Sequence, residues 1–278
     1  MKNIVILYHK NCPDGFGGAW AAWKKFGNKA EYIPIQYKMM SPRGLENKEI
    51  YLVDLCFQAE VMKKLLNISR KLIVIDHHIG RKEEIKISTG HLFDLNHSGS
   101  VLSWKYFHPG KKIPRLLRHI EDVDIWKFKI SGTKELMASL ATCDFDFRKW
   151  NKIADDFENA GKRKKYFDEG KAILKYQRKV ISKIVAAGEG VIFDGHKAFA
   201  VNSPILESEI GHRISEDKKV IGLIWSYQNG VFKGSLRNDG KINLSELAKK
   251  FGGGGHRAAA GFTFKAKIKF PWQHKKKK

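Results

Sequence analysis

The sequence predicts an α/β protein in which a doubly wound, mainly parallel sheet is joined by a helical linker to a smaller α+β domain. Three short runs rich in Val, Ile and Leu, at residues 3–9, 50–55 and 71–76, alternate with segments that have apolar residues at helical spacing. Continuous apolar runs are typical of strands buried on both faces of a parallel sheet. A long basic segment without proline follows, and then alternating strands with turn signals, which indicates a second domain.

The first half of the chain has a β-α-β-α-β pattern. A helix is expected over residues 18–26 after the first strand, and another over 58–66 after the second strand. This alternation predicts parallel strands with helices on both faces. Ligands of such sheets bind beyond the carboxyl ends of the strands. The residues that close each apolar run are therefore the first candidates for a functional site.

The second half begins with a helix expected over residues 159–187. The dipeptides Asp194-Gly195 and Asn229-Gly230 then indicate tight hairpins, and helices are expected at 206–215 and 243–251. The expected divisions are a first domain at 1–158, a helical linker at 159–189, a second domain at 190–270 and a basic tail at 271–278.

The composition favours a folded protein that binds a polyanion. Hydrophobic residues make up 42% of the chain, which excludes global disorder. The 52 basic and 29 acidic residues give a formal net charge of +23, which favours nucleic acid, nucleotides or polyphosphate as partners. A basic solvated surface without a specific partner is the alternative.

Cysteine usage and hydropathy predict a cytoplasmic location. Three irregularly spaced cysteines argue against a disulfide framework and favour a reducing compartment. The first apolar run is too short for a signal peptide, and no run approaches the roughly 20 residues of a membrane span. We therefore expect no membrane association, and we leave the oligomeric state open, with a homodimer as one alternative.

Acidic and imidazole side chains close all three apolar runs. They are His9 and Asp14 after the first run, Asp54 at the end of the second, and Asp76, His77 and His78 at the end of the third. A single aspartate after a strand is often only a cap or turn residue. Several carboxylates at one sheet edge repel one another, however, and a bound cation is the usual remedy. Oxygen and imidazole ligands favour Mn²⁺ or Mg²⁺ over structural zinc.

A second acidic cluster lies at residues 121–126, after a helical pattern at 113–120. An acidic C-terminal turn opposes the helix dipole, so another interaction is expected to compensate it. A bound metal ion is the functional interpretation of this cluster, and a solvated helix end is the purely structural alternative.

The order of these residues resembles the motifs of the DHH phosphoesterase superfamily. This superfamily includes RecJ-like exonucleases, oligoribonucleases, cyclic-dinucleotide phosphodiesterases and manganese pyrophosphatases. Residues 252–262, with the sequence GGGGHRAAAGF, are similar to the glycine signature of the DHH-associated domain. The two motifs occur in the correct order and cover nearly the whole chain. The resemblance implies a catalytic DHH domain followed by a substrate-binding DHH-associated domain.

The resemblance also implies a pair of divalent ions, Mn²⁺ with Mg²⁺ or Co²⁺ as alternatives. His9 and Asp54 would bind the first ion, and Asp54 would bridge to the second. The implied ligands of the second ion are Asp14, Asp54, His77 and Asp122, with Asp124 as the alternative to Asp122. Asp76 would orient His77, and His78 would face the scissile phosphate.

Motif one departs from the family pattern at Cys12, which stands where many members have an aspartate. Cysteine is a soft ligand that suits manganese poorly. The first metal site is therefore expected to be weak, differently built or filled only with substrate. Cys12 as a covalent nucleophile is the rival hypothesis, although the sequence identifies no base to activate it.

The glycine run predicts a phosphate-binding loop. Consecutive glycines allow backbone N–H groups to approach an anion closely, and a following His and Arg add donors. A flexible turn with a glycine helix cap is the alternative. The expected substrate contacts are Gly253, Gly254, Gly255, His256 and Arg257, with Arg237 by resemblance and Ser98 at a predicted helix N-terminus. A surface arginine and a helix cap are the alternatives for the last two residues.

Together these features predict a metal-dependent phosphodiesterase that hydrolyses short RNA or DNA, or dinucleotides, cyclic ones included. Hydrolysis of pyrophosphate or polyphosphate is the second hypothesis. A nucleotide- or nucleic-acid-binding protein that has lost catalytic power through its altered motif one is the third.

Overall fold

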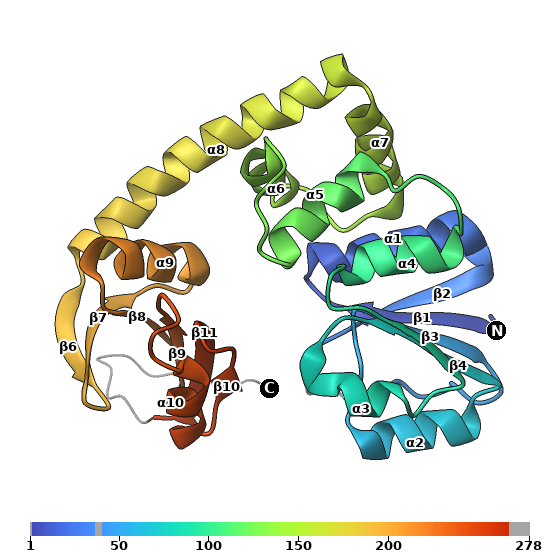
Figure 1. The fold of residues 1–278 in the computed structure, drawn as a ribbon, viewed down its shortest axis with the longest axis horizontal. Helices are drawn as coiled ribbons and strands as arrows, with labels where there is room; N and C mark the ends of the chain where they lie inside the picture. The colour runs from blue at the N-terminus through green and yellow to red at the C-terminus, as the bar shows by residue number, and fades with distance from the viewer. Residues whose placement is uncertain (1, 37–40, 267–278) are drawn as a thin grey trace. The chain divides into compact units, whose positions relative to one another are not determined.

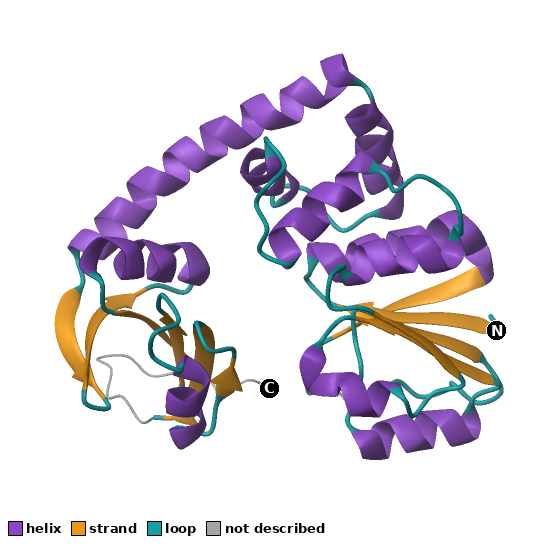
Figure 2. Cartoon of the chain, viewed as in Figure 1, coloured by secondary structure: helices purple, strands orange, loops and turns teal. Residues whose placement is uncertain are grey.

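The computed structural model describes residues 2–36 and 41–266 (Figures 1 and 2). The chain forms two compact units that divide between Leu174 and Lys175, and the long helix α8 (Ala160–Ala186) contributes residues to both. The expected basic tail at 271–278 lies outside the described residues. In the described ranges, every helix is too short or too polar to span a lipid bilayer.

The first unit is built on a five-stranded parallel sheet in the order β2-β1-β3-β4-β5. Its strands are β1 (Ile4–His9), β2 (Ala30–Ile35), β3 (Glu49–Val53), β4 (Lys71–Asp76) and β5 (Gly90–Phe93). This architecture confirms the α/β fold class. The three expected strands form the centre of the sheet. The edge strands β2 and β5 did not stand out in the sequence, because they are less buried and less continuously apolar than the central strands.

Helices cover both faces of this sheet (Figure 1). Helices α1 and α4 pack on one face, with α5, α6 and α7 beyond them in the same core cluster, and a second cluster packs α2 and α3 on the other face (Figure 1). Their bounds are α1 (Pro13–Phe26), α2 (Ala59–Ile68), α3 (Lys82–Ile85), α4 (Gly99–Phe107), α5 (Arg115–Asp124), α6 (Thr133–Leu140) and α7 (Phe147–Glu158), with short 3-10 turns η1 (Gly27–Lys29) and η2 (Ile79–Arg81).

The strand order places a topological switch point between β1 and β3. Strand β1 pairs with β2 on one side and with β3 on the other, so the chain changes direction across the sheet between these two strands. Ligands of open α/β sheets bind at the carboxyl ends of the strands beside such a point. Here those ends carry His9 and, one residue beyond β3, Asp54.

The second unit holds a mixed six-stranded sheet in the order β10-β11-β9-β8-β7-β6, in which β7 and β8 pair in parallel and the other pairs are antiparallel. Its elements are β6 (Glu189–Phe193), β7 (His196–Asn202), α9 (Glu207–Lys218), β8 (Ile221–Gln228), β9 (Val231–Arg237), α10 (Leu244–Lys250), β10 (Gly254–Gly255) and β11 (Ala259–Lys265). Both predicted hairpin dipeptides form turns with positive φ at each residue, as type I′ turns require.

Candidate metal centre

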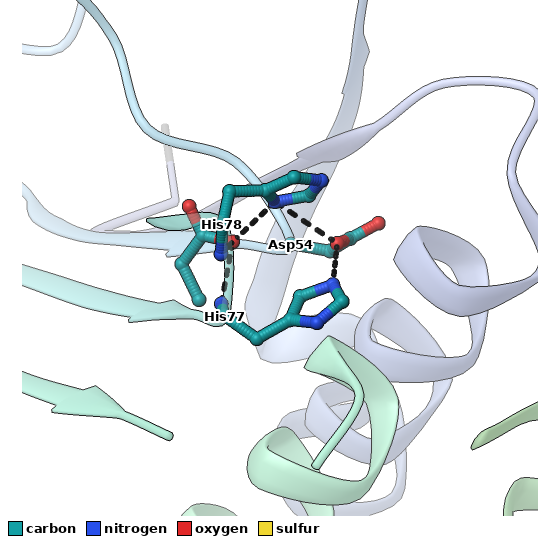
Figure 3. Close-up of side chains that lie close together, drawn as sticks. Asp54, His77 and His78 are labelled. Carbon is teal, nitrogen blue, oxygen red and sulfur yellow. Dashed lines mark hydrogen bonds and ion pairs between the residues drawn. The ribbon is translucent and has the colours of Figure 1, made fainter. Parts of the chain in front are cut away.

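Asp54 lies between two imidazole rings at the carboxyl edge of the parallel sheet. Its Oδ2 is 3.4 Å from Nδ1 of His9, and its Oδ1 is 3.4 Å from Nε2 of His77. Figure 3 shows His77 and His78 side by side, with both rings directed at Asp54. The ends of β1, β3 and β4 therefore deliver their side chains to one place, as their order in the sequence predicted.

A first donor group contains Asp14, His77 and Asp124, whose ligand atoms all lie within 4.8 Å of one another. Nε2 of His77 is 3.4 Å from Oδ2 of Asp124 and 3.9 Å from Oδ2 of Asp14. Asp54 faces the same imidazole nitrogen through its Oδ1. We call these four residues the oxygen-rich group. Three carboxylates and one imidazole are donors that suit Mn²⁺ or Mg²⁺.

A second donor group lies on the other side of the Asp54 carboxylate. His9, Cys12 and Asp54 each offer one ligand atom, and these atoms also lie within 4.8 Å of one another. We call them the sulfur-containing group. Asp54 thus takes part in both groups through different oxygens, which is the arrangement needed for a carboxylate that bridges two ions.

Buried polar atoms without partners mark this place as built for a cation. Both carboxylate oxygens of Asp54 and Oδ2 of Asp14 lack a hydrogen-bond partner among the described residues, although both side chains are about 1% exposed. A buried acceptor left unsatisfied costs about 1–3 kcal/mol, and more when it is charged. Asp54 also has φ of 53°, a left-handed conformation that is uncommon for residues other than glycine. Strained backbone of this kind clusters at functional sites.

The crowded carboxylates shift one another's pKa values. Burial, together with the charge of Asp54, raises the pKa of Asp14 to about 6. Burial and the charges of Asp14 and Asp54 raise the pKa of Asp124 to about 8. Asp54 behaves oppositely, because the imidazoles of His77 and His9 outweigh its burial and hold its pKa at about 2. Protons and metal ions therefore compete for the same oxygens.

Asp76 orients His78 and not the ring of His77, which corrects the expected role. Oδ1 of Asp76 lies 2.7 Å from Nδ1 of His78. The same oxygen accepts the backbone N–H of His77 at 2.7 Å, so it fixes only the main chain there. Burial lowers the pKa of His78, but the Asp76 carboxylate raises it by more. The pair favours a protonated His78 ring.

Asp122 is not part of the cluster, so the expectation that it completes the metal site is wrong. Its carboxylate accepts hydrogen bonds from the backbone N–H groups of Lys129 and Ile130 and from Oγ1 of Thr133. These bonds hold the loop between α5 and α6. Asp124, the alternative ligand, lies in the last turn of α5 with its carboxylate beside His77.

Two glycines that sequence reasoning did not single out allow the centre to close. A Cβ on Gly15 would collide with the carbonyl of His9. A Cβ on Gly99 would lie 2.7 Å from Cβ of Asp54 and 2.9 Å from Oδ2 of Asp14. The N-terminus of α4 can therefore approach both carboxylates, and the N–H of Ser100 donates to Oδ1 of Asp14 at 3.0 Å. In the sequence, each of these glycines lies next to a motif residue, Gly15 after Asp14 and Gly99 after Ser98, and this position could have identified them.

Ser98 is a helix cap and is not available to a substrate, which corrects its expected role. The residue is fully buried, and its hydroxyl accepts from the N–H of Val101 and lies 3.0 Å from Oγ of Ser100. Its own N–H donates to Glu121. The capping alternative is therefore the right one for this position.

The environment of Cys12 disfavours a free thiolate. Burial raises the pKa of the Cys12 thiol, and the negative charges of Asp54 and Asp14 raise it further. A nucleophilic cysteine needs cations or a helix N-terminus that lower its pKa, and here burial and the two carboxylates outweigh the N-terminus of α1 beside Cys12. The nucleophile hypothesis for Cys12 therefore has no support from its surroundings.

Part of the glycine run in the second unit forms hydrogen bonds and packing contacts within that unit. The N–H of Gly253 donates to Ala248 at the end of α10, and the N–H of His256 donates to Ala259. A Cβ on Gly253 would collide with the carbonyl of Gly261, which explains that glycine by packing. Gly254 and Gly255 form the edge strand β10. The expected nest of successive free N–H groups is therefore wrong at Gly253 and His256, while phosphate binding by Gly254, Gly255 and the exposed His256 side chain stays a prediction.

The two expected arginines also have contacts within the second unit. Arg257 donates through Nε to the carbonyl of Gly240 at 2.7 Å and through Nη2 to that of Lys241. Arg237 donates through Nη2 to Oγ of Ser208 and through Nη1 to the carbonyl of Leu236. Substrate binding by either guanidinium stays a prediction, and for Arg257 it would have to use its remaining donors.

Comparison with known proteins decides the family. The DHHA1 domain family matches residues 198–273, which include the glycine run. An uncharacterized protein of Acanthamoeba polyphaga mimivirus is 32% identical over 94% of this chain and 67% of its own length. The oligoribonuclease NrnB of Bacillus subtilis is 22% identical over 92% of this chain and 71% of its own length. The chain belongs to the DHH phosphoesterase superfamily.

The fold agrees with this membership. The crystal structure of RecJ in complex with Mn²⁺ from Thermus thermophilus superposes with a TM-score of 0.56 at 16% sequence identity. The match covers 93% of this DHH protein and 49% of RecJ. The DHH-associated domain is the second unit, and the donor groups around Asp54 lie at the switch point of the DHH sheet.

Paired substitutions distinguish the roles of Asp124 and Asp122. We expect Asp124→Asn to weaken Mn²⁺ binding at least about tenfold with little change in thermal stability, because it removes a ligand oxygen from an exposed edge of the cluster. We expect Asp122→Asn to lower the free energy of unfolding by about 1–3 kcal/mol while Mn²⁺ affinity is largely kept, because it leaves loop donors poorly paired. Isothermal titration and thermal melts measure both. Loss of Mn²⁺ binding in Asp122→Asn alone would reverse the assignment.

The raised pKa values predict how metal binding depends on pH. Asp14 and Asp124, with pKa values of about 6 and about 8, must lose protons before they bind a cation. Burial lowers the pKa of the His77 imidazole, but the carboxylates of Asp54, Asp124 and Asp14 raise it by more, to about 9, so this ligand must also lose a proton. Apparent Mn²⁺ affinity should therefore rise as pH increases from 6 to about 9 and level off above that range. Titrations at several pH values measure this, with Asp124→Asn as the variant that should show a weaker dependence. Affinity that does not change between pH 6 and 8 would contradict the shifts.

Proposed function

We propose that this DHH protein is a divalent-metal-dependent phosphodiesterase that hydrolyses short oligonucleotides or dinucleotides, linear or cyclic. The observation that carries the proposal is the Asp54 carboxylate, buried and without a hydrogen-bond partner in the described chain, between two donor groups. A two-cation site of this kind suits in-line attack of water on a phosphate. NrnB, a relative along most of the chain, is an oligoribonuclease by name, which favours nucleotide substrates.

The residues of the centre have different roles in the proposed hydrolysis. When bound, the divalent cations supply Lewis acidity to the phosphate and lower the pKa of water. Asp14, Asp54 and Asp124 provide the negative charge that holds such cations. His78 is fixed through Nδ1 by Asp76, so its ring is oriented to donate a hydrogen bond from Nε2 toward a phosphate or leaving-group oxygen. Its side chain is 32% exposed, which leaves it accessible to a substrate.

The net charge of +23 attracts polyanions in general, pyrophosphate included. A different feature favours a nucleotide over inorganic pyrophosphate. Trp126, two residues beyond Asp124, is 65% exposed with φ of 57°, and Phe128 meets it edge to face at 4.8 Å between ring centroids. A large exposed indole two residues along the chain from a candidate metal ligand is suited to stack on a nucleobase. Pyrophosphate offers nothing for it to stack on.

The experiment that tests the function is a substrate panel with Mn²⁺, run on the wild type and on Asp54→Asn. A dinucleotide, a short oligoribonucleotide, a cyclic dinucleotide, longer single-stranded DNA and pyrophosphate should be compared. We expect hydrolysis of the short nucleotide substrates, and a loss of at least about 100-fold in Asp54→Asn, because the shared ligand is removed. Activity confined to pyrophosphate would reject the proposal. Nucleotide binding without any hydrolysis would favour the non-catalytic alternative.

Substitution of Trp126 tests the stacking surface. We expect Trp126→Ala to raise KM for an oligonucleotide about fivefold or more with a smaller change in kcat, because stacking of one base is worth about 1–3 kcal/mol. Tyr176→Ala is the matched control, since Tyr176 is 70% exposed on α8 and its sequence position is far from the DHH motifs. Equal KM values for the two variants would exclude a role for Trp126 in binding the base.

A further inference from the structure

The donor atoms on the two sides of Asp54 differ in chemical type. The oxygen-rich group offers carboxylates of Asp14, Asp54 and Asp124 with one imidazole. The sulfur-containing group offers one imidazole, one thiol and one carboxylate, from His9, Cys12 and Asp54. Because metals differ in their preference for sulfur, one cation species does not suit both groups equally.

The position of Cys12 is fixed by the chain on both sides of it. Asn11 has φ of 57°, which turns the chain sharply after β1. Pro13 stands at the first position of α1, and the carbonyl of Cys12 accepts the N–H of Phe16 at 2.9 Å. Cys12 is the N-cap residue, yet its side chain makes no capping hydrogen bond. The backbone is therefore held in place while the sulfur is not used to cap the helix.

A second observation points to a cation beside this sulfur. Oδ2 of Asp54, which faces His9 at 3.4 Å, is buried and lacks a hydrogen-bond partner among the described residues. A buried carboxylate oxygen in this state needs a positive charge or a donor. The thiol and the imidazole lie within 4.8 Å of it, close enough for small side-chain rotations to bring all three onto one ion.

We propose that His9, Cys12 and Asp54 bind a thiophilic divalent cation, Zn²⁺ in the first instance, while the oxygen-rich group takes Mn²⁺ or Mg²⁺. Three protein ligands of the types Cys, His and Asp with an open fourth position are the pattern of a catalytic zinc site. Sites with nitrogen and sulfur donors bind Zn²⁺ and Co²⁺ more tightly than Mn²⁺. The centre is thus a mixed-metal pair that shares Asp54. This inference rests on the proposed function only in using the same metal centre. Metal binding is measured without substrate turnover, so the two proposals can fail separately.

Cobalt spectroscopy tests the sulfur ligand directly. Co²⁺ added to the metal-free full-length protein should give one equivalent with a thiolate-to-cobalt charge-transfer band in the near ultraviolet. Cys12→Ser should lose this band and bind Zn²⁺ at least about tenfold more weakly. Cys143→Ser is the matched control, because Cys143 is a partly exposed free cysteine outside both donor groups, and it should keep the band. A band that survives in Cys12→Ser, or no band in the wild type, would overturn the proposal.

Metal content gives an independent measure that does not depend on one variant. After exposure to equal Zn²⁺ and Mn²⁺ and removal of free metal, the wild type should retain one equivalent of zinc. Cys12→Asp, which restores an oxygen donor, should retain less zinc and more manganese. Equal zinc content in the wild type and in Cys12→Asp would contradict the assignment of Cys12. Nucleotide hydrolysis by a protein that retains manganese alone would reject this inference and leave the proposed function intact.

Discussion

Repulsion among three carboxylates, two of them fully buried, dominates the carboxyl edge of the parallel sheet. Asp14, Asp54 and Asp124 face one another around the imidazole of His77, and burial raises the cost of their charges. A protein can relieve such repulsion with protons or with cations. The two imidazoles that flank Asp54 keep that carboxylate ionised while Asp14 and Asp124 become better bases. The site is therefore arranged to exchange protons for metal ions.

The local geometry that permits this crowding comes from small residues and from unusual backbone. Gly15 and Gly99 let helices α1 and α4 approach the ends of β1 and β3 where any side chain would collide. Asp54 adopts a left-handed conformation immediately after β3. The N–H of Ser100 then offsets part of the charge of Asp14 at the N-terminus of α4. Substitution at the two glycines would therefore damage the centre without touching a ligand.

The sequence predicted the sheet centre and its polar ends because buried parallel strands leave continuous apolar runs. It could not separate Asp122 from Asp124, since both lie in one helical turn and point to different sides of α5. The loop bonds that occupy Asp122 and the buried hydroxyl of Ser98 are tertiary contacts with no local pattern. The pairing of Gly254 and Gly255 with β11 likewise could not be predicted, because glycines carry no apolar pattern. Edge strands β2 and β5 were missed because partial burial weakens their apolar pattern.

The proposed function and the mixed-metal centre both require that one carboxylate, that of Asp54, binds two cations. Anomalous diffraction from crystals prepared with Zn²⁺ and Mn²⁺ tests this most directly, because the two metals are distinguished at their absorption edges. We expect two peaks on opposite sides of Asp54, each about 2.0–2.3 Å from one of its oxygens, with zinc beside Cys12 and manganese beside Asp124. A single peak, or peaks with no bond to Asp54, would contradict this requirement.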